Sequence, residues 1–115
     1  MAVTPDGKRI LSGDDAGDVR VWRRIGFLER PFFELHTDYV SALVALPDNQ
    51  HALSASLDNT VKLFNVNDGA AVRTFTHHTG PVWSLSLLPD GLRFVSGSED
   101  KTARIVKRGL ALNSN

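Results

Sequence analysis

Short apolar runs alternate with polar turns along the whole chain, and this pattern recurs with a period of 42 residues. No segment has the apolar spacing of three and four residues that is typical of an amphipathic helix, so the pattern predicts short strands joined by tight turns. A repeat in the forties built from such strands indicates a stacked or radial repeat architecture. The predicted fold class is therefore all-β.

Residues 35–76 form one complete copy of the repeated unit, and the pattern predicts a four-stranded antiparallel meander. The apolar positions from Val40 to Ala45 are spaced by three and then by two, which indicates a β-bulge near Ser41 and Ala42. The four predicted strands cover 39–46, 52–55, 60–65 and 71–76.

Incomplete copies lie on both sides of this unit. The first, residues 1–34, is expected to lack its inner strand and to hold the second strand, the third strand and an outer strand. That outer strand, within 27–35, is an edge or irregular strand because Pro31 cannot donate to a ladder. The third copy, residues 77–115, is expected to lack its outer strand, and its three strands are predicted at 82–88, 93–97 and 102–107.

Three aligned phrases resemble the WD-repeat β-propeller family. They are Leu11-Ser-Gly-Asp-Asp-Ala-Gly-Asp-Val-Arg-Val-Trp22, Leu53-Ser-Ala-Ser-Leu-Asp-Asn-Thr-Val-Lys-Leu-Phe64 and Phe94-Val-Ser-Gly-Ser-Glu-Asp-Lys-Thr-Ala-Arg-Ile-Val106. The resemblance implies a partial β-propeller of four-stranded antiparallel blades. These blades are expected to form an open arc rather than a closed ring, because the chain holds about three copies of the unit whereas propellers close with about four to eight blades. The chain is accordingly expected to be a fragment of a longer propeller.

The resemblance also implies a structural hydrogen-bond set in each blade, made by a histidine, a serine or threonine, an aspartate and a tryptophan. Such a set satisfies buried polar groups and fixes the turn between strands. The second unit offers His36, Ser54 and Asp58 with Phe64 at the tryptophan place; the third offers His78, Ser96 and Asp100 with Val106; the first offers Ser12 and Trp22 with Ala16 at the aspartate place. None of the three sets is complete.

The same residue types make up a nucleophilic triad, so a hydrolase is an alternative. However, serine follows histidine by 18 residues and aspartate follows serine by 4 in both units. A catalytic centre is normally single, whereas repeated units repeat their scaffold chemistry. No catalytic residue is therefore expected. No metal or cofactor is expected either, because adjacent His77 and His78 point in opposite directions and no cysteine or carboxylate cluster completes a site.

Thirteen basic residues balance thirteen acidic ones, so the net charge does not favour nucleic acid or an anionic membrane as a partner. A small basic cluster at Arg104, Lys107 and Arg108 is expected on a solvated face. The absence of cysteine is typical of a reducing compartment, and no apolar run is long enough to span a bilayer. These features favour an intracellular protein, cytoplasmic or nuclear.

Large aromatic residues occur where the copies differ and where the turns predict exposure. Trp83 aligns with Ser41, and Tyr39 aligns with a proline. Both follow a histidine turn, on the face that the resemblance implies for partners. Together with Leu57 and Glu99 they form a predicted partner-binding rim, because aromatic residues supply much of the binding energy at protein interfaces. The alternative is that Trp83 fills a gap between blades.

The sequence therefore predicts a non-catalytic WD-repeat scaffold that binds other proteins or peptides. Its remaining propeller blades would come from the full-length protein or from another chain. The alternative from a different class is a self-assembling unit whose copies complete a ring. Unpaired strand edges and unclosed apolar faces are the reason for this alternative, and the isolated chain is expected not to behave as a monodisperse monomer.

Overall fold

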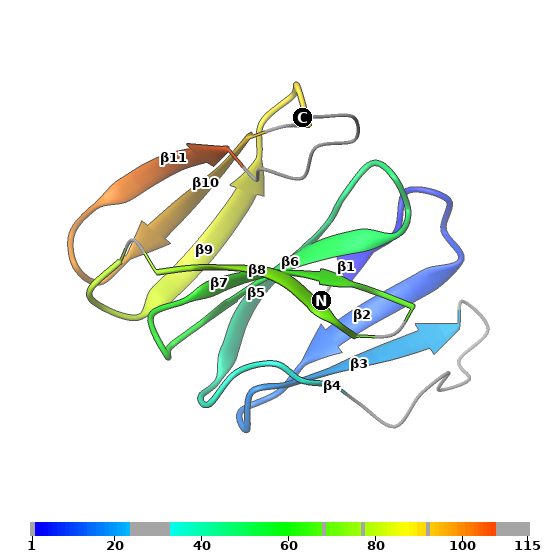
Figure 1. Ribbon diagram of the computed structural model, residues 1–115, viewed down its shortest axis with the longest axis horizontal. Helices are drawn as coiled ribbons and strands as arrows, with labels where there is room; N and C mark the ends of the chain where they lie inside the picture. The colour runs from blue at the N-terminus through cyan, green and yellow to red at the C-terminus, as the bar shows by residue number, and fades with distance from the viewer. Residues whose placement is uncertain (1, 24–32, 68, 77, 92, 108–115) are drawn as a thin grey trace.

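Three separate antiparallel sheets follow one another along the chain (Figure 1). The computed structural model describes residues 2–23, 33–67, 69–76, 78–91 and 93–107. The strands are β1 (Ala2–Val3), β2 (Arg9–Gly13), β3 (Asp18–Arg23), β4 (Phe33–Glu34), β5 (Val40–Ala45), β6 (His51–Ser56), β7 (Val61–Asn65), β8 (Ala71–Phe75), β9 (Val82–Leu87), β10 (Arg93–Ser98) and β11 (Ala103–Lys107). Within these ranges the protein has no helix, so none that could cross a membrane. The all-β prediction is confirmed.

Each sheet contains one unit of the repeat, in the strand orders β1-β2-β3-β4, β5-β6-β7-β8 and β9-β10-β11. No sheet closes on itself. In Figure 1 the middle sheet lies between the other two, which fan out on its two sides. This is the arrangement of blades in an open arc.

The first unit corrects one expectation, because it does contain part of an inner strand. β1 pairs with β2, and Val3 lies opposite Ile10. The same pairing recurs between Ala45 and Ala52 in the second sheet. Only two residues form this strand, too few to show the alternation on which strand prediction depends. Part of the predicted outer strand of this unit and the end of the third unit, residues 108–115, lie outside the described residues.

The backbone repeats its conformation even where the residues differ. Two turns of every unit place one residue in the left-handed region, where only glycine is free of steric cost. The first turn has Gly7, Asn49 and Gly91 at φ 72°, 61° and 69°, and the second has Gly17, Asn59 and Lys101 at φ 94°, 77° and 70°. Both series are spaced by 42 residues, so the turns keep the same backbone conformation in all three units even where their residues differ.

The predicted β-bulge is confirmed in the second sheet and recurs in the third. The β5–β6 register places Val40 opposite Ser56 and Ala42 opposite Ala55, so Ser41 is the extra residue. In the β9–β10 pair the register shifts at the same repeat position, and Trp83 is the extra residue. A bulge re-aims a side chain out of the regular alternation. Equivalent bulges therefore set the direction of the Ser41 and Trp83 side chains.

Two apolar clusters hold the sheets together, one on each face of the middle sheet. The first joins it to the sheet before it and contains Leu11, Val19, Val21, Leu35, Val40, Leu43, Ala52, Phe64 and Val66. The second joins it to the sheet after it and contains Leu46, Leu53, Ala55, Val61, Leu63, Phe75, Val82 and Phe94. The middle sheet is thus buried on both sides, and five of the six residues of β6 are buried.

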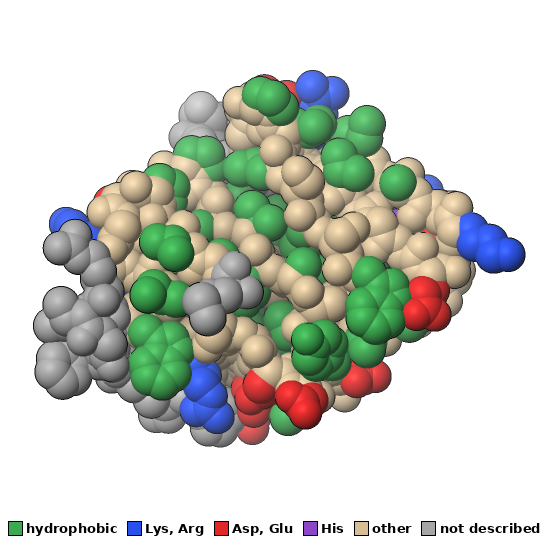
Figure 2. Space-filling view, turned by 180° about the vertical axis from the view of Figure 1, so that it is seen from behind, with side chains coloured by type: hydrophobic (Ala, Val, Ile, Leu, Met, Phe, Trp, Pro, Cys, Tyr) green, Lys and Arg blue, Asp and Glu red, His purple; other side chains and the backbone are tan. Residues whose placement is uncertain are grey.

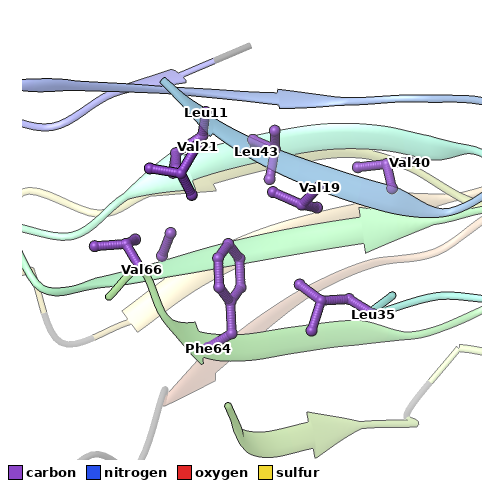
Figure 3. Close-up of a cluster of buried hydrophobic side chains, with 9 residues drawn as sticks. Leu11, Val19, Val21, Leu35, Val40, Leu43, Phe64 and Val66 are labelled. Atoms are coloured by element: carbon purple, nitrogen blue, oxygen red, sulfur yellow. The ribbon is translucent and has the colours of Figure 1, made fainter. Parts of the chain in front are cut away.

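Phe64 is the largest side chain of the first cluster and is fully buried. Figure 3 shows its ring reaching from β7 toward Val19 and Val21 of the neighbouring sheet. At the other junction the rings of Phe75 and Phe94 meet edge to face, with centroids 5.1 Å apart. Aromatic contacts of this geometry add to the burial energy.

Phe64→Ala should lower the free energy of unfolding by about 3 to 5 kcal/mol, because it leaves a cavity between two sheets. Urea denaturation measures this change. The matched control is Val72→Ala on β8, where the side chain is 47% exposed and the change should stay within about 0.5 kcal/mol. Equal effects of the two substitutions would contradict this account of the core.

Candidate functional site

The turn ahead of β5 is tied to the β6–β7 turn by a buried histidine. His36 Nδ1 lies 2.9 Å from Asp58 Oδ2, and His36 Nε2 lies 2.7 Å from Ser54 Oγ. Because a carboxylate only accepts, Nδ1–H donates to Asp58. Burial of the ring favours its neutral form, in which Nε2 accepts from the Ser54 hydroxyl.

The third unit repeats this arrangement. His78 Nδ1 lies 2.9 Å from Asp100 Oδ2, and His78 Nε2 lies 2.8 Å from Ser96 Oγ. Both histidines and both serines are buried. The structure thus brings together the two sets of three residues that the sequence singled out. It also shows that Ser54 and Ser96 turn their hydroxyls toward histidine and away from solvent.

Burial lowers the pKa of His36, and it outweighs the neighbouring Asp58 carboxylate, which acts in the opposite direction. Burial acts to raise the pKa of Asp58, but hydrogen bonds from Thr60, Thr37 and His36 outweigh it and lower the value. The Thr60 hydroxyl donates to Asp58 at 2.5 Å. The folded set therefore combines a neutral imidazole with an ionised carboxylate. The pKa of Asp100 is also lowered, chiefly by the hydroxyl of Thr102.

The first unit fixes its turn differently. Trp22 Nε1 donates to Ser12 Oγ at 2.9 Å. Ala16 occupies the position of the aspartate, and the side chain of Asp14 makes the hydrogen bonds of this turn instead. Asp14 Oδ1 accepts from the backbone N–H groups of Ala16 and Asp18 at 3.0 and 2.9 Å. A carboxylate two residues earlier in the chain therefore satisfies the same turn.

Sequence reasoning missed the hydroxyl residues that complete each set. Thr60 and Thr102 donate to Asp58 and Asp100. Ser56 donates to the Asp38 carbonyl oxygen at 3.1 Å, and its counterpart Ser98 donates to that of Gly80. All four recur at the 42-residue period, so the signal was present. Serine and threonine are common in turns, which hid the signal.

The exposed aromatic residues lie beside the turns that these sets hold. Trp83, the bulge residue of β9, is 47% exposed, and its Nε1 donates to Glu99 Oε2 at 2.6 Å. Tyr39 is 40% exposed, and its carbonyl accepts the Leu57 N–H at 3.0 Å. The structure thus pairs the four predicted rim residues as Trp83 with Glu99 and Tyr39 with Leu57.

The rim turns are anchored to the buried sets through the backbone. Asp58 accepts the N–H of Thr37 at 3.1 Å, and Asp100 accepts that of Thr79 at 3.0 Å. Glu99 N–H donates to the Pro81 carbonyl at 2.9 Å. In the space-filling view, hydrophobic and acidic side chains lie side by side at the lower right of one face, with a basic side chain at the far right (Figure 2). This face therefore presents apolar surface next to charged side chains.

A family model described as WD domain, G-beta repeat, matches residues 1–23, 29–65 and 69–107. The chain belongs to the WD-repeat family. The matched segments have the same period as the sheets but are offset from them by one strand, since 29–65 includes β4 of the first sheet and 69–107 includes β8 of the second. The resemblance stated from the aligned phrases is confirmed.

Similar proteins share part of this chain. Periodic tryptophan protein 2 of Arabidopsis thaliana is 33% identical over 79 residues, 69% of this chain and 9% of that protein. Apoptotic protease-activating factor 1 of Mus musculus is 38% identical over 67% of this chain and 6% of its own length. Target of rapamycin complex subunit wat1 of Schizosaccharomyces pombe is 30% identical over 59% of this chain and 24% of its own. The chain thus spans less than a quarter of each relative's length.

Acidification should destabilise the protein from near neutral pH downward. The ordinary pKa of histidine is 6.5, and the pKa of His36 in the folded protein is lower. At pH values between these two pKa values, His36 is therefore protonated more in the unfolded state than in the folded state. The free energy of unfolding therefore falls as the pH drops through this window. Asp58, whose folded pKa lies below the ordinary 3.8, adds a further loss in stronger acid.

Urea denaturation at pH 7.5, 6.5 and 5.5 measures the first loss, and His36→Gln is the matched variant. This variant should be less stable at pH 7.5, because Ser54 and Asp58 lose their partner, at a cost of about 1 to 3 kcal/mol. Its stability should also depend less on pH than that of the wild type. An unchanged slope would show that His36 is not held neutral.

Proposed function

We propose that this chain is a non-catalytic scaffold that holds other proteins or peptides at the rim formed by Tyr39, Leu57, Trp83 and Glu99. The observation that supports this most is Trp83, a large aromatic side chain that is nearly half exposed. A bulge aims it outward, and Glu99 holds its indole. Exposed aromatic residues of this kind are the usual anchors of protein interfaces.

The hydrogen-bonded turns support the proposal because they hold the rim before a partner arrives. The backbone that leads into Tyr39 and Trp83 is tied to the buried histidine sets through the N–H groups of Thr37 and Thr79. A surface that is ordered in advance loses little conformational entropy on binding. The same sets would then serve binding indirectly, as positioning groups.

A catalytic role for the histidine sets has little support. Each set would need its serine hydroxyl to reach a substrate, since a nucleophile acts only within contact distance. Ser54 and Ser96 are both fully buried, with hydroxyls that face histidine. The relative named as a subunit of a complex also agrees with a scaffold. The absence of cysteine agrees with an intracellular setting, the cytoplasm or the nucleus.

The experiment is quantitative affinity capture from a cell extract with the wild type and three variants. Trp83→Ala should deplete a set of captured proteins by about 10- to 30-fold, which corresponds to the 1.4 to 2 kcal/mol or more of an interface anchor. Trp83→Ser, which installs the residue of the equivalent position 41, should behave in the same way. Val72→Ala, equally exposed on β8, should capture the same set as the wild type.

Thermal melting of each variant separates binding from packing. Trp83→Ser should melt within a few degrees of the wild type, because the second unit folds with serine at that position. If the Trp83 variants lose folded protein, the residue packs between blades. If they fold and capture the same proteins, the rim is not the binding surface.

A further inference from the structure

A small polar hollow lies beside Tyr39 and distinguishes this part of the rim. It has a volume of about 100 Å³ and is lined by Gly13, Tyr39, Val40, Ser41, Ala42 and Leu43. The bulge takes Ser41 out of the β5–β6 ladder, so backbone of an irregular segment faces this space. Since a water molecule takes up roughly 30 Å³, the hollow has room for about three waters, or for one small polar head group.

Exposed carboxylates occur on the turns that carry the rim residues. Asp38 precedes Tyr39, and Glu99 lies against Trp83. The first-unit turn that bears exposed Asp15 adjoins the same segment, since the Val40 N–H donates to the carbonyl of Asp14 at 3.0 Å. Arg20 lies 3.9 Å from Asp14, and Lys101 follows Asp100 in the next turn.

We infer that the rim binds an extended segment of a partner protein through a lysine or arginine side chain. The aliphatic stem of that side chain lies against the Tyr39 ring, and its cationic head enters the hollow next to Asp38, the carboxylate that adjoins Tyr39. An aromatic face attracts a cation, and carboxylates steer positively charged partners toward the surface. This inference rests on the proposed function and adds the chemistry of the partner.

Negatively charged partners fit the same surface poorly. An acidic peptide, a nucleic acid or an anionic lipid surface would bring negative charge against Asp15, Asp38 and Glu99. Like charges placed opposite one another oppose association. A basic protein segment is the partner that meets both the aromatic surface and the charge.

Fluorescence anisotropy with the full chain tests the inference. The probes are three fluorescein-labelled peptides of the form Gly-Ser-X-Ala-X-Ala-X-Ser-Gly, in which X is arginine, glutamine or glutamate. The arginine peptide should bind at least about 10-fold more tightly than the glutamine peptide, with the glutamate peptide weakest, and added salt should weaken its binding. Tyr39→Ala and Glu99→Gln should each weaken it by about 3- to 10-fold, and Val72→Ala should leave it unchanged.

The outcomes separate the inference from the proposed function. If the glutamine peptide binds as tightly as the arginine peptide, and Trp83→Ala weakens both, the rim binds peptides but does not select basic ones. The inference then fails and the proposed function stands. If the arginine peptide binds and no rim substitution affects it, both fail. If no peptide binds, the inference fails, and affinity capture decides the proposed function.

Discussion

The burial of both faces of the middle sheet is the constraint on which the rest of the structure depends. A β-sheet with two apolar faces is stable only if each face is covered, and here the two neighbouring sheets cover them. Phe64 and Ala52 face one neighbour, whereas Leu53 and Leu63 face the other. The repeat therefore stabilises the protein through contacts between successive units, as repeat architectures do.

Because the sheets stack on one another, polar and charged side chains are accommodated mainly at the ends of the strands. The sheet faces are committed to packing, so polar residues gather in the turns, where histidine, serine, aspartate and threonine satisfy one another. The bulges of the second and third units lie beside these turns and direct one residue of each of these units away from the sheet. In the second unit that residue is Ser41, which donates to the Val82 carbonyl of the next sheet. In the third it is Trp83, which is exposed. One geometry thus serves packing in one unit and presents an aromatic surface in the other.

Much of the fold could be predicted from the sequence because it is encoded in local patterns. The 42-residue period, the turns and the step of three at Val40 and Leu43 are visible without coordinates, and the bulge follows from that step. Other features depend on three-dimensional proximity. The replacement of an aspartate by Asp14, the role of Thr60 and the hollow beside Tyr39 arise from residues that meet only in the fold. The two residues of β1 are too few for any pattern to reveal.

Native-state hydrogen exchange tests the stacking account most directly. Because the middle sheet is buried on both faces, the amides of Leu53 and Ala55 on β6 should exchange only through global unfolding. They should therefore be the slowest in the chain, whereas those of Leu11 on β2 and Val95 on β10 should exchange sooner, through partial opening of the outer sheets. Equal protection in all three sheets, or greater protection in an outer sheet, would contradict the claim that the doubly covered sheet holds the structure together.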